Sequence, residues 1–230
     1  MIQENLARLR AEIADICLKT GRKPDSVKLV GVSKMFPVPV LQQAYDAGLR
    51  IFGENKPQEF RDKHPQLPKD IEWHLIGHLQ SNKVKYVAGK AELIHSVDSL
   101  SLAEEINKVA GRSEVIQKVL IEVNTSGEDS KIGLYTYREV EELALSIAEL
   151  KSLDLRGLMT IGPNTTDEDA IRMAFAGLRG MIEDLNKQGF RLTELSMGMT
   201  QDFEIAIEEG ATIIRVGTAL FGARNYKSIK

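Results

Sequence analysis

A short apolar run leads to a lysine in the stretch Leu29-Val30-Gly31-Val32-Ser33-Lys34. The run has the length and composition of a strand whose two faces are both covered. Pro37 follows soon after, and proline cannot donate the hydrogen bond that a central strand requires. We therefore expect the amine of Lys34 to lie at the carboxyl end of a buried strand.

Burial at such a position disfavours the charged form of a lysine and lowers its pKa. A neutral amine can attack a carbonyl carbon and form a Schiff base. The simpler interpretation is a lysine that ends the strand and points into water. Taken alone, the stretch favours this simpler interpretation, so the function of Lys34 depends on what the rest of the chain places around it.

Strand-like and helix-like segments alternate about eight times along the chain, with short connections between them. The expected strands span residues 29–33, 50–53, 71–76, 92–97, 115–123, 153–159, 193–196 and 211–216. Alternating units of this kind form a parallel sheet with right-handed crossovers. Eight of them predict a (β/α)8 TIM barrel, here a single domain over residues 1–230.

Two further patterns bear on this fold. The chain begins with an amphipathic helix whose apolar face consists of Ile2, Leu6, Leu9, Ile13 and Ile16. This helix is an addition to the barrel because it precedes the first strand. A doubly wound open sheet is the rival architecture, but it has fewer strands, and no Gly-x-Gly-x-x-Gly motif follows the first strand.

The composition excludes several classes of protein. Of the 230 residues, 43% are hydrophobic and 27% charged, as in soluble globular proteins. The formal charge of −3, without a basic tail, argues against nucleic-acid binding. One cysteine cannot form an intrachain disulfide and fits a reducing compartment. Without a secretory signal or a membrane-spanning run, we expect a cytoplasmic monomer that binds no membrane.

The loops after the last two strands carry small polar residues and glycines. The active face of a (β/α)8 barrel lies at the carboxyl ends of its strands, and the loops after strands seven and eight often bind phosphate. Glycine lets backbone N–H groups approach an anion closely. The residues of this kind are Ser196, Gly198, Gly217 and Thr218. Singly the glycines could be turn residues, but both loops together with Lys34 match the needs of pyridoxal 5′-phosphate (PLP), an aldehyde with a phosphate.

Arg215 lies between two apolar neighbours in the eighth strand, so its side chain points to the opposite face from theirs. It could face a helix and pair with an acid. Alternatively, its guanidinium could contact the ring nitrogen of a pyridine. A permanently charged arginine would keep that nitrogen unprotonated, which makes the ring a weaker electron sink.

Histidines suggest a metal site only weakly. His74 and His78 follow one another closely, but no carboxylate or cysteine cluster of matching spacing accompanies them. His95 shows no evident partner in the sequence. We therefore expect no metal.

Five stretches, in this order and over essentially the whole chain, resemble the pyridoxal phosphate homeostasis protein family. They are Val32-Ser33-Lys34, Gly53-Glu54-Asn55, the block from Trp73 to Lys83, Ser196-Met197-Gly198-Met199 and the block from Arg215 to Gly222. The resemblance implies a fold-type III barrel like the N-terminal domain of alanine racemase. It implies PLP as a Schiff base on Lys34, with Arg215 at the ring nitrogen. The cofactor-binding residues that it implies are Lys34, Asn55, Ser196, Gly198, Arg215, Gly217 and Thr218.

The resemblance also implies a protein that buffers or delivers PLP, with PLP-dependent apo-enzymes as recipients, and that is not an enzyme. Racemases of the alanine racemase type use a second, β-rich domain and a tyrosine from the partner subunit as a second base. The chain leaves no room for that domain after its eighth strand, and no tyrosine is an obvious base. The alternatives are a low-rate PLP-dependent racemase and a Schiff-base aldolase acting on a phosphorylated substrate.

Overall fold

The strands form a closed parallel barrel. The computed structural model describes residues 1–128 and 131–222. The strands pair in chain order, and β8 pairs with β1 to close the barrel. They are β1 (Lys28–Val32), β2 (Ile51–Glu54), β3 (Glu72–Leu75), β4 (Leu93–Val97), β5 (Gln117–Glu122), β6 (Leu153–Met159), β7 (Glu194–Ser196) and β8 (Ile213–Val216). The expected (β/α)8 barrel is confirmed.

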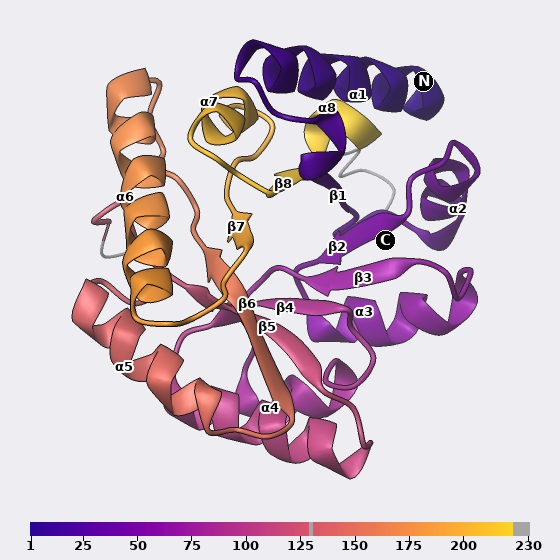
Figure 1. Cartoon of the computed structure of the whole chain (residues 1–230). Helices are drawn as coiled ribbons and strands as arrows, with labels where there is room; N and C mark the ends of the chain where they lie inside the picture. The colour runs from indigo at the N-terminus through magenta and orange to yellow at the C-terminus, as the bar shows by residue number, and fades with distance from the viewer. Residues whose placement is uncertain (129–130, 223–230) are drawn as a thin grey trace.

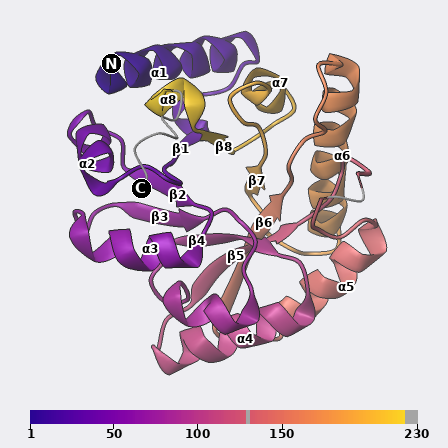
Figure 2. The same cartoon turned by 180° about the vertical axis from the view of Figure 1, so that it is seen from behind.

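Helices surround the barrel (Figures 1 and 2). They are α1 (Ile2–Lys19), α2 (Val38–Asp46), α3 (Pro57–Lys63), α4 (Leu100–Arg112), α5 (Tyr137–Ala148), α6 (Glu168–Lys187), α7 (Phe203–Glu208) and α8 (Thr218–Phe221). Short 3-10 helices lie at η1 (Pro24–Ser26), η2 (His64–Gln66) and η3 (Ser81–Tyr86). Within the described residues, none of the helices combines the length and the apolar character that crossing a membrane requires.

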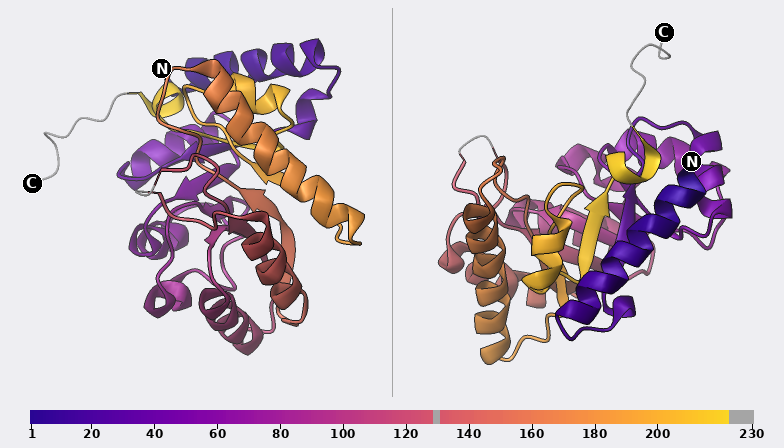
Figure 3. Two further views of the ribbon diagram at one scale, coloured as in Figure 1. Left: turned by 90° about the vertical axis from the view of Figure 1, so that its left-hand side faces the viewer. Right: turned by 90° about the horizontal axis from the view of Figure 1, so that it is seen from above.

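The expected N-terminal helix is α1, and it buries the predicted apolar face through Leu6, Leu9, Ile13 and Ile16. It packs against α7 and α8, beside the seam where β8 meets β1 (Figure 3). The seam is the place where the first and the last strand of the barrel meet, so α1 and α8 cover the closure from outside.

The barrel interior has an apolar layer and a polar layer. Val30, Leu93, Leu120, Met159 and Ile213 form a small apolar cluster, separate from the larger core between strands and helices. Successive side chains of a strand alternate between its faces. Two residues after Leu93, Leu120 and Ile213 come the buried polar residues His95, Glu122 and Arg215, which form a polar layer nearer the carboxyl ends of these strands.

The segment between β3 and β4 has a different geometry from the other connections. Ser81–Tyr86 is a 3-10 helix and not an α-helix. Val84 and Val87 are both fully buried, and a spacing of three residues puts them on one side of a helix with three residues per turn. β-Branched residues also weaken the preference for the α-helical form.

Candidate functional site

A cavity of about 820 Å³ opens at the carboxyl ends of the strands. Four of the predicted site residues line it: Lys34, Arg215, Gly217 and Thr218. Lys34 follows β1, whereas Gly217 and Thr218 follow β8, so the pairing of these two strands brings the amine and the glycine loop to one cavity.

The residue before Lys34 is held from two sides. The Ser33 hydroxyl donates to Oε1 of Glu54 at 2.7 Å, and the Ser33 carbonyl accepts from Nζ of Lys63 at 3.0 Å. Lys63 also donates to Oε1 of Glu54 at 2.7 Å and is only 8% exposed. Burial holds the pKa of Glu54 above its usual value, and the nearby Lys63 ammonium only partly opposes this shift. The end of β1 is therefore tied to β2 and to α3.

The residue after Lys34 is held by the same group. Met35 has a φ of 66°, in the left-handed region that non-glycine residues rarely adopt. Its backbone N–H donates to Oε2 of Glu59 at 2.7 Å, and that carboxylate accepts from Lys63 at 2.8 Å. We call Glu54, Glu59 and Lys63 the anchor triad. It fixes the backbone on both sides of Lys34.

Arg215 points into the barrel, so the helix-facing alternative is wrong. One guanidinium nitrogen donates to Oγ of Ser196 at 2.5 Å, and the other donates to the carbonyl of Thr160 at 2.8 Å. Burial lowers the pKa of Arg215 to about 10, and the carboxylates of Asp202 and Glu122 oppose that shift. The side chain therefore stays charged at neutral pH at the edge of the cavity.

Ser196 and Gly198 support Arg215 and do not line this cavity. Ser196 is fully buried against the guanidinium. The Gly198 carbonyl accepts from the backbone N–H of Arg215 at 2.9 Å. Gly198 has a φ of 92°, and a Cβ there would lie 2.5 Å from Cβ of Ala206 in α7, so only glycine fits. Their phosphate-binding roles stay predictions.

Asn55 is not among the residues that line this cavity. It lines a neighbouring cavity of about 440 Å³ together with Lys56, His78 and Lys83. Its Oδ1 atom is buried and accepts no hydrogen bond from the residues that the structure describes. Because Val32 pairs with Gly53 in the register of β1 and β2, Asn55 and Lys34 follow equivalent positions of neighbouring strands, and the role of Asn55 near the cofactor stays a prediction. No group of three metal-ligating side chains is found within residues 1–128 and 131–222.

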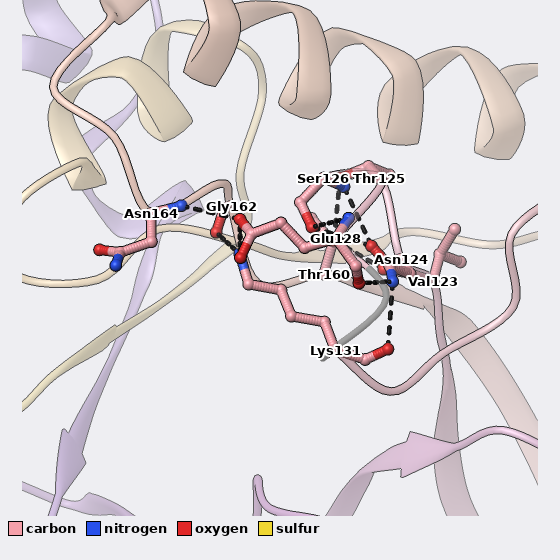
Figure 4. A network of polar contacts seen from close by, with 9 residues as sticks. All are labelled: Val123, Asn124, Thr125, Ser126, Glu128, Lys131, Thr160, Gly162 and Asn164. Carbon is pink, nitrogen blue, oxygen red and sulfur yellow. Dashed lines mark hydrogen bonds and ion pairs between the residues drawn. The ribbon is translucent and has the colours of Figure 1, made fainter.

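The loop after β5 adds a second lysine, Lys131, to the cavity lining. Figure 4 shows the polar contacts of this loop. Nζ of Lys131 donates to Oε1 of Glu128 and to the carbonyl of Gly162, both at 2.7 Å. The side-chain amide of Asn124 donates to the carbonyls of Glu128 and Lys131 at 2.9 and 3.1 Å. The backbone N–H of Asn164 donates to Glu128. This loop is therefore tied to the loop after β6.

Two groups at or beneath the site were not predicted from the sequence. The anchor triad joins α3 to β2, and its only local signal is the spacing of Glu59 and Lys63, four residues apart on one helix. His95, for which the sequence indicated no partner, contacts His74 and Ser196, each at 2.9 Å. The alternation of side chains along a strand could have predicted that His74, His95 and Ser196 point into the barrel. It could not have predicted that they lie at the same height along the barrel axis and contact one another.

Comparison with known proteins agrees with the fold and the motifs. A family model described as "Alanine racemase, N-terminal domain" matches residues 5–225. A pyridoxal phosphate homeostasis protein from Aquifex aeolicus is 45% identical over 225 residues, which are 97% of this chain and 98% of the relative. This chain belongs to the pyridoxal phosphate homeostasis protein family. The family member from Escherichia coli is 40% identical over 98% of this chain and 97% of its own.

Solved structures give the same family and a wider fold relationship. The structure of PipY from Synechococcus elongatus with PLP bound has a TM-score of 0.85 and 38% identity, covering 96% of this chain and all of PipY. An alanine racemase from Clostridium difficile has a TM-score of 0.75 at 14% identity, covering 96% of this chain and 61% of its own. The second likeness shows the fold alone.

Proposed function

We propose that this chain binds PLP through Lys34 and acts in PLP homeostasis by buffering or delivering the cofactor. One observation carries the proposal. In a chain of the pyridoxal phosphate homeostasis protein family, a single cavity brings together a lysine amine, a buried arginine and the glycine–threonine loop after β8. An amine, a ring partner and an anion-binding loop are the groups that this cofactor requires.

The cavity residues fit this cofactor. A volume of about 820 Å³ lies within the usual range for small-molecule sites. Its donors include Lys34, Lys131, Arg215 and Thr218, and Val32 and Ile161 supply apolar walls. When bound, PLP supplies an aldehyde carbon that an amine can trap and a phosphate that cationic and hydroxyl groups can hold.

The chain's own residues then have separate tasks. The anchor triad presents the Lys34 amine from a fixed backbone. We assign Arg215 to the ring nitrogen. A charged guanidinium only donates hydrogen bonds, so a nitrogen beside it accepts and stays unprotonated. Arg215 therefore restrains the electron-withdrawing power of the ring.

The titratable side chains of the cavity lining bear on proton transfer. In the described part of the chain the lining includes no tyrosine and no histidine. The second lysine, Lys131, is engaged by Glu128, and of the two lining carboxylates, Glu168 and Asp202, the second accepts a hydrogen bond from the backbone N–H of Met199. Because a carboxylate can act as a second base, the proposal of a carrier rather than an enzyme rests on the family relationship. Recipient apo-enzymes and a monomeric state belong to this proposal.

Titration of the ligand-free protein with PLP, followed by amino acids in deuterated water, tests the proposal. We expect a coloured, saturable complex that Lys34→Ala does not form and that Lys131→Met retains. We expect no deuterium at the α-carbon of any amino acid in a panel. Exchange at useful rates would support a racemase instead, and a protein that traps sugar phosphates but not PLP would support an aldolase.

A further inference from the structure

Four polar side chains form a continuous chain of hydrogen bonds across the barrel interior. Nδ1 of His74 lies 2.9 Å from Nε2 of His95, and Nδ1 of His95 lies 2.9 Å from Oγ of Ser196. Ser196 in turn accepts from Arg215 at 2.5 Å. None of the four is more than 4% exposed. We call His74, His95, Ser196 and Arg215 the core relay.

The relay connects strands that are not neighbours. His74 and His95 lie on β3 and β4, whereas Ser196 and Arg215 lie on β7 and β8. The bond between His95 and Ser196 therefore crosses the barrel between strands separated by β5 and β6. The relay ends at Arg215, which lines the cavity.

The direction of each hydrogen bond follows from Arg215, which can only donate. Because Ser196 accepts from Arg215, its hydroxyl proton is free to be donated to Nδ1 of His95. Nε2 of His95 then carries a proton and donates it to Nδ1 of His74. In the reverse order, His95 would donate to Ser196 and leave the fully buried hydroxyl proton with no acceptor in the relay, which is costly.

This order requires both imidazoles to be neutral. Burial, together with the smaller effects of the charges of Lys28 and Lys118, lowers the pKa of His74 to about 3. Burial also lowers the pKa of His95 well below its usual value, with His74, Arg215 and Lys28 acting in the same direction. These are the charged groups that act on the two histidines, and all of them disfavour imidazolium.

We propose that His95 is a positioning residue that acts through Ser196 to fix the guanidinium plane of Arg215 at the cavity. The hydroxyl of Ser196 and the carbonyl of Thr160 accept hydrogen bonds from two different guanidinium nitrogens, and together they define that plane. Ser196 can accept the hydrogen bond from Arg215 in this geometry only while its own hydroxyl proton points away from the guanidinium, towards His95. The effect on a bound cofactor rests on the proposed function.

The relay can be tested first without any ligand. Imidazole 15N chemical shifts of the ligand-free protein report the tautomer and the charge of each histidine. We expect His74 and His95 to be neutral, with the proton on Nε2, from mildly acidic to mildly basic pH. A proton on Nδ1 of His95, or an imidazolium at either position, would overturn the proposal.

Two substitutions of the same residue then test positioning. His95→Asn places an amide oxygen near the former Nδ1 and keeps an acceptor for Ser196, whereas His95→Leu removes it. We expect His95→Leu to shift the absorption maximum of bound PLP and to weaken PLP binding about tenfold. His95→Asn should retain both properties of the natural protein.

The proposal is contradicted if His95→Asn and His95→Leu have the same absorption maximum and the same affinity for PLP, whether both match the natural protein or both are impaired. Thermal unfolding of both variants separates positioning from loss of the fold. Should His95→Leu not fold, Ser196→Ala removes the same support and should show the same shift. If the natural protein binds no PLP at all, the proposed function fails, while the tautomer measurement still decides the relay.

Discussion

Glu122 ends β5 in the polar layer of the barrel and is only 6% exposed. Burial and, to a smaller extent, the charge of Asp98 raise the pKa of Glu122 against the opposing effect of Arg215, and the net value is about 7. A carboxyl group whose pKa is higher in the folded than in the unfolded state binds more protons when folded. Folding stability therefore falls as the pH rises between those two values.

For Glu122 that window runs from about 4.5 to about 7. We expect Glu122→Gln to raise the free energy of unfolding at about pH 8 by up to about 3 kcal/mol. Below the window the substitution should have little effect, because the carboxyl group is protonated in both states. Urea unfolding at the two pH values measures this difference, and a variant less stable than the natural protein at about pH 8 would contradict it.

Gly198 combines backbone strain with a close approach to α7, and Gly189 serves as its matched control. Both have positive φ, 92° and 103°, but a Cβ at Gly189 would meet no atom within 4 Å. We expect Gly189→Ala to cost about 1 kcal/mol through strain alone. Gly198→Ala should cost at least about 2 kcal/mol more, because its Cβ clashes with Ala206. Equal losses in thermal unfolding would show that the clash is relieved at little cost.

At the scale of secondary-structure elements, the anchor triad joins α3 to the ends of β1 and β2. Among the hydrogen bonds of the described residues, Lys63 donates to the carboxylates of Glu54 and Glu59 and to the Ser33 carbonyl, and it is the only member of the triad that contacts all three. Removing one partner of a buried ion pair leaves an uncompensated charge, whereas removing both is often tolerated. We therefore expect the stabilities of α3 and of the ends of β1 and β2 to depend on one another through the charges of the triad.

We expect Lys63→Met to lower the free energy of unfolding by about 3 kcal/mol. Glu54→Gln combined with Lys63→Met should lose less than Lys63→Met alone, because the double variant removes the buried charge on Glu54. Urea unfolding of the two single variants and the double variant forms a complete cycle. A double variant with the summed losses of both single variants would argue against the coupling.

The secondary-structure elements could be predicted from the sequence, but the anchor triad that joins them could not. Alternating apolar runs and helix patterns located all the strands, because each pattern is local. Lys63 lies 30 residues from Ser33, and His95 lies 101 residues from Ser196. No local pattern reports which side chains of such distant segments meet. Asn55 shows the same limit, since its place after β2 does not tell which cavity it lines.

At the scale of the whole molecule, closure of the barrel creates the site. Pairing of β1 with β8 places the segment after Val32 beside the segment after Val216. Lys34 and Thr218 thus line one cavity only because the sheet closes, and the prediction of an eight-stranded barrel was enough to place them at the same end of adjacent strands. An alanine racemase shares this barrel at 14% identity, so the fold leaves the chemistry to the side chains around the mouth.

The central claim is that Lys34 holds the cofactor. Reduction of the PLP complex with borohydride, digestion and peptide mass mapping test it most directly, because reduction makes the lysine linkage permanent. We predict one pyridoxyl adduct, on the peptide that contains Lys34, and the same adduct in Lys131→Met. An adduct only on another lysine, or a Lys34→Ala variant that is labelled as fully as the natural protein, would contradict the account.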